Sequence, residues 1–250
     1  MFSLYFSHSN VSLQPYKQHI YMNFSKTVFI LIVLLGTLAC NNTQTKTTTI
    51  STPKKNKVPK NTAIEKSWDS LKHHNVVAFF TEYEKQHKET VVLIKTKFGN
   101  IKIRLYKDTP IHRANFIFLT KIGYFDTTVF YRVAPNFVIQ GGNSDDFYTM
   151  KQRHKYGNYL MKPEFRSNRK HKYGALAAAR EWENNPDKLS SPFEFYIVQN
   201  RKGAHHLNNE HTVFGEVISG FSTIDKIANL EAGADEWPKV DVHMKIEVVK

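Results

Sequence analysis

Three side chains of different chemistry lie close together in one short run of this sequence: Arg132, Phe137 and Gln140. Apolar stretches at residues 128–133 and 137–140 flank a Pro-Asn turn, so the run predicts a pair of strands. Arginine stays charged and presents a rigid fork of hydrogen-bond donors. The chemistry open to this set is therefore charge stabilisation beside an apolar slot, with no nucleophile among the three.

The run FYRVAPNFVIQGG, at residues 130–142, resembles the signature of the cyclophilin-type peptidyl-prolyl isomerases. Further blocks resemble the same family, in the same order, over residues 91–249. They are Thr109-Pro110 with Ala114-Asn115-Phe116, residues 174–180, Phe195-Tyr196-Ile197, and Leu207 with residues 211–215. Each block is weak by itself, but together and in order they are highly specific.

The resemblance implies that Arg132, Phe137 and Gln140 are the catalytic residues, with Arg132 the principal one. It also implies a set of side chains that line the proline pocket and the neighbouring groove: Val138, Ala179, Arg180, Glu194, Tyr196, Leu207 and His211. Amide resonance sets a barrier of about 18–20 kcal/mol to rotation of the peptide bond. A catalyst has only to bind the twisted amide better than either planar form, so no metal or cofactor is expected.

Four positions depart from the residues usual in the family: this chain has Val138 where Met is usual, Tyr196 where Phe is usual, His206 where Trp is common and Glu194 where Gln is usual. Glu194 matters most because it adds a negative charge. It could pair with Arg132, and then either orient the guanidinium or weaken its field. It could instead pair with Arg180 and leave Arg132 free.

The N-terminal part of the chain is similar to a bacterial lipoprotein signal. Lys26 precedes an apolar run at residues 28–35, and small residues lead into Cys40, the single cysteine of the chain. In such a signal the cysteine is lipidated and becomes the mature N-terminus. One departure is Thr37, where the motif usually has Leu, so an ordinary signal peptide or an uncleaved anchor stays an alternative.

Composition shifts divide the chain into five parts. We expect an upstream extension or mis-assigned start at 1–21, a lipoprotein-type signal peptide at 22–39, a flexible tether at 40–66, a helical extension at 67–88, and a cyclophilin-like domain at 89–250. The tether is rich in Thr, Asn and Lys, which cannot bury enough apolar surface to fold.

The fold class expected from residue 91 onward is mostly β. Apolar residues alternate with polar ones in several short runs, and two longer runs, at 110–123 and 221–230, show helical spacing. Because no βαβ rhythm is present, these elements predict a closed eight-stranded antiparallel barrel capped by two helices. The segment 143–162 is expected to be an excursion with no readable function.

The net charge of +13 favours solvated basic surface over a nucleic-acid site, because the sequence has no finger spacing, RNP-like run or basic helix. A metal site at His205, His206 and His211 is not expected either, since cysteines and carboxylates are missing at ligand spacing.

The leading hypothesis is a lipid-anchored prolyl isomerase that acts on proline-containing segments of exported proteins in a bacterial envelope, facing the periplasm. Two alternatives stay open: a cyclophilin-like scaffold that binds such segments with little turnover, and a barrel that serves only attachment.

Overall fold

The computed structural model describes residues 71–157 and 159–249. Cys40 and the predicted extension, signal peptide and tether lie outside the described residues, as do the first four residues of the predicted helical extension. None of the described helices is both long and apolar enough to cross a membrane.

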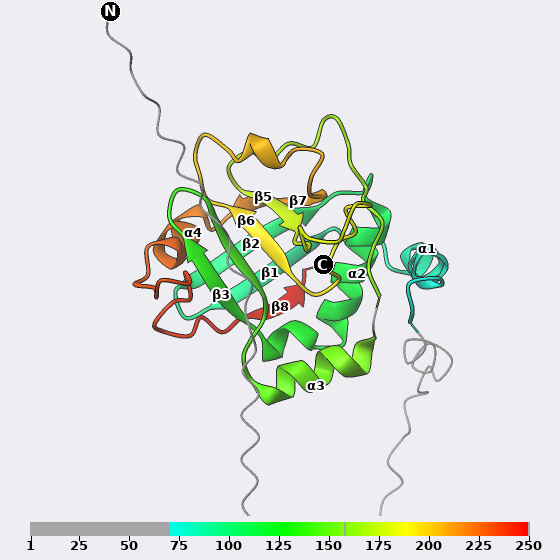
Figure 1. Cartoon of the computed structure of the whole chain (residues 1–250), viewed down its shortest axis with the longest axis horizontal. Coiled ribbons are helices and arrows are strands. Elements are labelled where there is room, and N and C mark those ends of the chain that lie inside the picture. Colours follow the sequence, from blue (N-terminus) through cyan, green and yellow to red (C-terminus); the bar gives the residue numbers. More distant parts are fainter. Residues whose placement is uncertain (1–70, 158, 250) are drawn as a thin grey trace, which may run out of the picture. The chain divides into compact units, whose positions relative to one another are not determined.

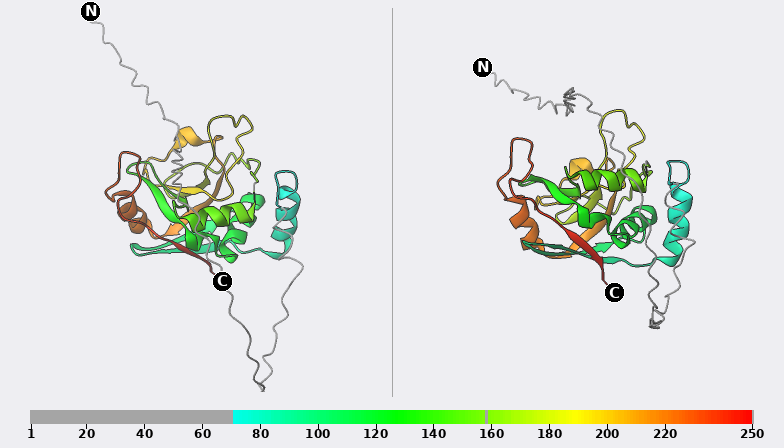
Figure 2. Two further views of the ribbon diagram at one scale, coloured as in Figure 1. Left: turned by 60° about the horizontal axis from the view of Figure 1, so that its bottom comes forward. Right: turned by 90° about the horizontal axis from the view of Figure 1, so that it is seen from below.

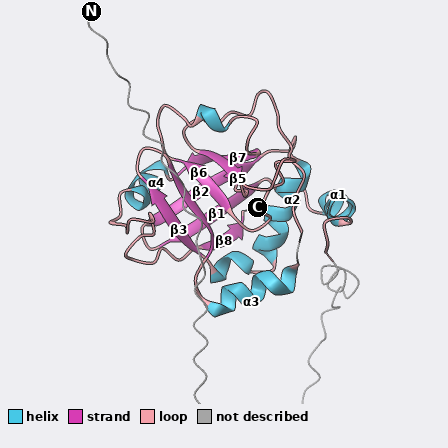
Figure 3. Ribbon diagram, viewed as in Figure 1, coloured by secondary structure: helices cyan, strands magenta, loops and turns pink. Residues whose placement is uncertain are grey.

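Eight strands form one antiparallel sheet in the order β3-β4-β6-β5-β7-β2-β1-β8 (Figures 1 and 3). Their bounds are β1 Val91–Thr96, β2 Gly99–Leu105, β3 Val129–Ala134, β4 Val138–Asn143, β5 Ala175–Ala178, β6 Phe195–Val198, β7 Val213–Ser219 and β8 Lys245–Val248.

The sheet is an open, curled half-barrel, so the prediction of a closed barrel was wrong. The two end strands, β3 and β8, do not form a ladder, and a single isolated bridge joins Val129 to His243 just before β8. Apolar residues alternate with polar ones from residue 240 onward, as in a strand, but β8 begins only at Lys245. Val242 and Met244 are buried beside β3 without lying in a strand, which explains why their alternation suggested one.

The described part of the chain has four α-helices: α1 Val76–Gln86, α2 Pro110–Lys121, α3 Phe147–Tyr156 and α4 Phe221–Ala228. Short 3-10 turns lie at Tyr124–Thr127 and His205–Leu207. Both predicted capping helices are present as α2 and α4, and α2 has Pro110 in its first turn as expected.

Helix α3 was not predicted. It begins after Asp146, whose Oδ1 accepts a hydrogen bond from the backbone N–H of Tyr148 at 2.6 Å. Only Thr149 and Tyr156 of this helix are buried, while Phe147 is exposed. The apolar residues therefore do not follow a helical stripe, and the periodicity that reveals most helices is absent here.

The central strands bury side chains on both faces. On β6, Phe195 and Ile197 belong to the large core that packs on α2, whereas Tyr196 and Val198 belong to a second, smaller apolar cluster. Strand β5 divides its residues in the same alternating way. Successive side chains of a strand point to opposite faces, so the two clusters lie on opposite sides of the sheet.

Helix α1 packs beside α2 rather than on the sheet (Figure 2). The ring of Phe80 is fully buried and meets the ring of Phe118 of α2 with centroids 5.8 Å apart. One turn later Glu84 forms an ion pair with Arg113, which is 1% exposed and also donates to backbone carbonyls of residues 87 and 89. Aromatic packing and a partly buried ion pair thus join α1 to the domain.

We expect Phe80→Ala to lower the free energy of unfolding by about 3–5 kcal/mol, because it leaves a cavity between α1 and α2. Val77→Ala is the matched control: Val77 lies on the same helix, is 42% exposed, and its change should cost less than about 0.5 kcal/mol. Urea denaturation followed by circular dichroism measures both. Equal stabilities of the two variants would show that α1 is not docked on α2.

Candidate functional site

The three residues predicted to be catalytic lie together at the paired strands β3 and β4. Arg132 and Gln140 are direct partners in the antiparallel register, and Nη1 of Arg132 donates to Oε1 of Gln140 at 3.4 Å. The guanidinium carbon lies 5.7 Å from the centroid of the Phe137 ring, which precedes β4. The register of one hairpin therefore places a fixed cation beside an aromatic face.

The predicted pocket residues form an apolar cluster beside this cation. Val138, Tyr196 and Leu207 are buried members of the smaller apolar cluster, and the partly buried Phe137 packs against it. The ring of His211 meets the ring of Tyr196 edge-on, with centroids 5.4 Å apart. The structure thus brings together side chains from β4, β6 and the segment 205–211.

The hydroxyl of Tyr196 is held by His171, a residue that the sequence did not single out. Nε2 of His171 lies 2.9 Å from the hydroxyl, and Nδ1 lies 3.0 Å from Oδ1 of Asn208. That amide oxygen also accepts the backbone N–H of His171, so Nδ1 carries the ring proton and Nε2 accepts from Tyr196. Burial raises the pKa of Tyr196 well above its usual value, so the hydroxyl stays a donor.

Arg180 is held away from Glu194 by a different acid. Its Nη2 lies 2.8 Å from Oε2 of Glu210, and its Nε donates to the Glu210 carbonyl at 2.8 Å. The guanidinium also lies over the exposed ring of Trp182, 4.2 Å from its centroid, and Trp182 in turn meets His211. Ala179 is buried in the smaller apolar cluster. Its backbone N–H donates to the carbonyl of Glu194, and its carbonyl accepts from the N–H of Ser191.

Glu194 pairs with neither of the arginines considered from the sequence. Its Oε1 lies 2.6 Å from Nη1 of Arg153, on the unpredicted helix α3, and its Oε2 accepts from the Tyr131 hydroxyl at 3.1 Å. That hydroxyl accepts from Nε2 of Gln140. A continuous row of hydrogen bonds therefore runs from Arg132 through Gln140 and Tyr131 to Glu194, and it fixes which end of the Gln140 amide faces Arg132.

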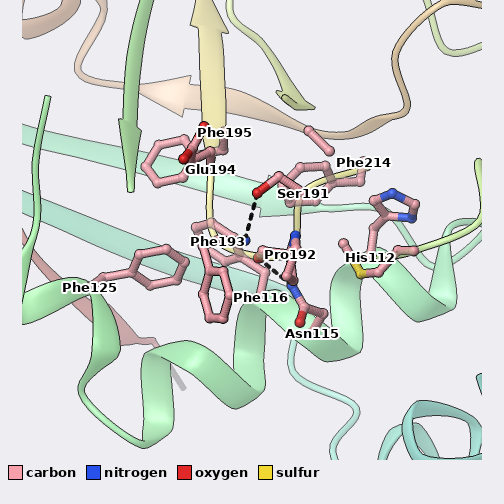
Figure 4. A pocket seen from close by; sticks show the side chains of 12 residues that line it. His112, Asn115, Phe116, Phe125, Ser191, Pro192, Phe193, Glu194, Phe195 and Phe214 are labelled. Atoms are coloured by element: carbon pink, nitrogen blue, oxygen red, sulfur yellow. Dashed lines mark hydrogen bonds between the residues drawn. The ribbon is translucent and has the colours of Figure 1, made fainter. Parts of the chain in front are cut away.

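Two hollows lie near these residues. Figure 4 shows the smaller, which lies between α2 and the segment before β6 and has a volume of about 10 Å³, room for about one water molecule. It is part of the core rather than a binding pocket. The larger, of about 390 Å³, is lined by two of the predicted groove residues, Arg180 and Glu194, together with Arg153.

No group of three histidine, cysteine or acidic side chains is placed to hold a metal ion in residues 71–157 and 159–249. His171 and His211 instead lie with ring centroids 6.5 Å apart and are engaged by an amide and a backbone carbonyl.

A family model described as "Cyclophilin type peptidyl-prolyl cis-trans isomerase/CLD" matches residues 91–248. A peptidyl-prolyl cis-trans isomerase of Acinetobacter baylyi is 36% identical over 143 residues, which cover 56% of this chain and 73% of that protein. A putative peptidyl-prolyl cis-trans isomerase of Staphylococcus epidermidis is 31% identical over 64% of this chain and 91% of its own length. A crystal structure of a Cryptosporidium parvum cyclophilin, determined in the presence of the dipeptide Ala-Pro, superposes with a TM-score of 0.55 at 26% identity, covering 64% of this chain and 99% of that one.

The two buried histidines make stability depend on pH. Burial lowers the pKa of His171 and of His211 from 6.5 to about 4. The unfolded chain therefore binds protons that the folded protein does not, so stability is full above about pH 6.5 and falls as the pH decreases toward 4. Between about pH 7 and pH 5 each histidine should lower the free energy of unfolding by about 2 kcal/mol.

We expect His171→Asn to reduce this loss of unfolding free energy by about 2 kcal/mol in urea titrations at pH 7 and pH 5. An unchanged pH dependence would contradict the prediction.

Proposed function

Because this chain belongs to the cyclophilin-type peptidyl-prolyl cis-trans isomerases, and so catalyses rotation of prolyl peptide bonds, we propose that Arg132 is its principal catalytic residue. The single observation that supports this most is the position of the guanidinium, beside the ring of Phe137 and in register with Gln140. An apolar wall and a fixed cation are the two parts that the chemistry requires.

The proposed mechanism is non-covalent. The pyrrolidine ring packs on the apolar surface of Phe137, Val138, Leu207 and the rings of Tyr196 and His211. As the prolyl amide twists it loses resonance, and its nitrogen and carbonyl oxygen become better hydrogen-bond acceptors. Arg132 donates to the twisted amide more strongly than to either planar form, which lowers the barrier.

The state of Arg132 suits this role. Its Nε and Nη1 are engaged by protein acceptors, and none of its contacts within the described residues uses Nη2. A guanidinium already held at two nitrogens has little rotational freedom left to lose when it binds the transition state. Preorganised donors of this kind are usually the largest source of rate enhancement.

We expect Arg132→Ala to lower kcat for a proline-containing tetrapeptide by about 10²-fold or more, because one preorganised donor is lost. Arg104→Ala is the matched control, since Arg104 is a mostly exposed strand arginine on β2 that pairs with Glu216. A protease-free assay that follows cis-to-trans relaxation by NMR measures both. If Arg132→Ala turned over like wild type, Arg132 would not be the principal catalytic residue. If neither the wild type nor Arg132→Ala accelerated cis-trans exchange, but both bound the peptide, the scaffold hypothesis would be favoured.

We also propose that the substrates are proline-containing segments of exported proteins and that a lipid at Cys40 tethers the domain to a membrane facing the periplasm. The support is the sequence pattern alone: a charged residue, a short apolar run and small residues before the single cysteine.

For this proposal we expect the full chain, expressed in a bacterium, to incorporate an alkyne-labelled fatty acid and to sediment with membranes. Because the chain has one cysteine, Cys40→Ser should abolish labelling completely. Labelling that persists in the variant, or is absent from the wild type, would exclude lipidation at Cys40. A variant that loses the label but stays in the membrane fraction would indicate an uncleaved anchor.

A further inference from the structure

An acidic loop, residues 231–239, lies against the catalytic strand although it is about a hundred residues later in the chain. The backbone N–H of Val133 donates to the carbonyl of Glu236 at 2.9 Å, and the ring of Trp237 contacts the ring of Tyr131 with centroids 5.7 Å apart. The loop is closed on itself by a bridge between Ala232 and Pro238. These contacts fix it on β3 on both sides of Arg132.

The loop places a carboxylate directly on Arg132. Oε2 of Glu236 lies 2.5 Å from Nε of Arg132, the shortest polar contact that Arg132 makes within the described chain. Since Gln140 accepts from Nη1, the guanidinium is held at two of its three nitrogens by groups that come from different parts of the sequence. Two such contacts define the plane of the guanidinium, whereas either one alone would let it rotate.

The backbone at Glu236 supports a specific role for this side chain. Its φ is +63°, in the left-handed region that favours glycine over residues with a Cβ atom. A non-glycine residue in this region costs stability, and such residues are retained where the surrounding structure or the function requires them. Here the side chain that imposes the cost is the one that contacts Arg132.

We propose that Glu236 is the positioning residue of Arg132: its carboxylate holds Nε so that Nη2 is presented to the prolyl amide. This inference rests on the proposed role of Arg132 and adds to it. Of the other acids near the site, Glu194 reaches Arg132 only through Tyr131 and Gln140 and is itself paired with Arg153, and Glu210 is paired with Arg180. Glu236 is therefore the one carboxylate in direct contact with Arg132 among the residues described.

The test compares three variants with a control on the same loop. Glu236→Ala removes the acceptor, and Glu236→Gln keeps an acceptor oxygen without the charge. The control is Glu231→Gln, because Glu231 lies on the same loop but pairs with Lys239 rather than with Arg132. Glu236→Gly also removes the acceptor but relieves the backbone, so we expect its Tm to rise by about 2–4 °C. This variant separates loss of activity from loss of folding.

The expected result is a fall in kcat of about tenfold for Glu236→Ala and Glu236→Gly with KM nearly unchanged, because the apolar pocket is intact while the donor is misplaced. Glu236→Gln should keep at least about a third of kcat, since the hydrogen bond to Nε survives. Glu231→Gln should match the wild type. A Glu236→Ala variant as fast as the wild type, or faster, would overturn the proposal.

A second measurement does not depend on turnover. In ¹⁵N-labelled protein the Nε–H resonance of Arg132, identified by its loss in Arg132→Lys, should be sharp and slow to exchange in the wild type and in Glu231→Gln. It should broaden in Glu236→Ala. If the wild type fails to accelerate prolyl isomerisation, the proposed function falls, and this resonance still decides whether Glu236 holds Arg132. A resonance unchanged in Glu236→Ala would refute the contact.

Discussion

The core of the domain and the proposed site both depend on three short strands that are buried on both faces. Along β4, β5 and β6, alternate side chains enter the large core against α2 and the smaller apolar cluster that we propose as the proline-binding site. Since the period of a strand is two, a slip of one residue would exchange the two sets. The residues that stabilise the domain and the residues proposed to bind the substrate are therefore specified by the same register, and neither set can shift without the other.

The charges around the site are arranged as local ion pairs rather than as a common field. Arg132 contacts the carboxylate of Glu236 and Arg153 that of Glu194, while Arg180 shares the carboxylate of Glu210 with Lys188. Although the chain carries a net charge of +13, each of these three arginines therefore has a carboxylate beside it. Attraction of anions to the site is thereby limited, while each guanidinium keeps a defined direction. Directed donors, rather than net positive charge, are what a twisted neutral amide can use.

Much of the sheet could be predicted from the sequence, and the failures have identifiable causes. The strand pair predicted at residues 128–133 and 137–140 is present as β3 and β4, and this hairpin brings Arg132, Phe137 and Gln140 together. The closed barrel was wrong because β3 and β8 do not pair: beside β3 the chain forms only one isolated bridge, although the alternating burial of Val242 and Met244 resembles a strand. Helix α3 has no apolar stripe. His171 and Glu236 reach the site from loops far along the chain, and no local pattern distinguishes such residues from surface ones.

The hydrogen bond between Tyr196 and His171 has an evolutionary consequence. A tyrosine at this position needs a buried acceptor, and His171 supplies it. Changing Tyr196 to phenylalanine would leave Nε2 of His171 without its hydrogen-bond donor, while changing His171 first would leave the Tyr196 hydroxyl without its acceptor. Either order passes through an intermediate with an unsatisfied buried polar group, at a cost of about 1–3 kcal/mol. The two positions are thus expected to vary as a unit, and the path between the two solutions to cross a barrier in fitness.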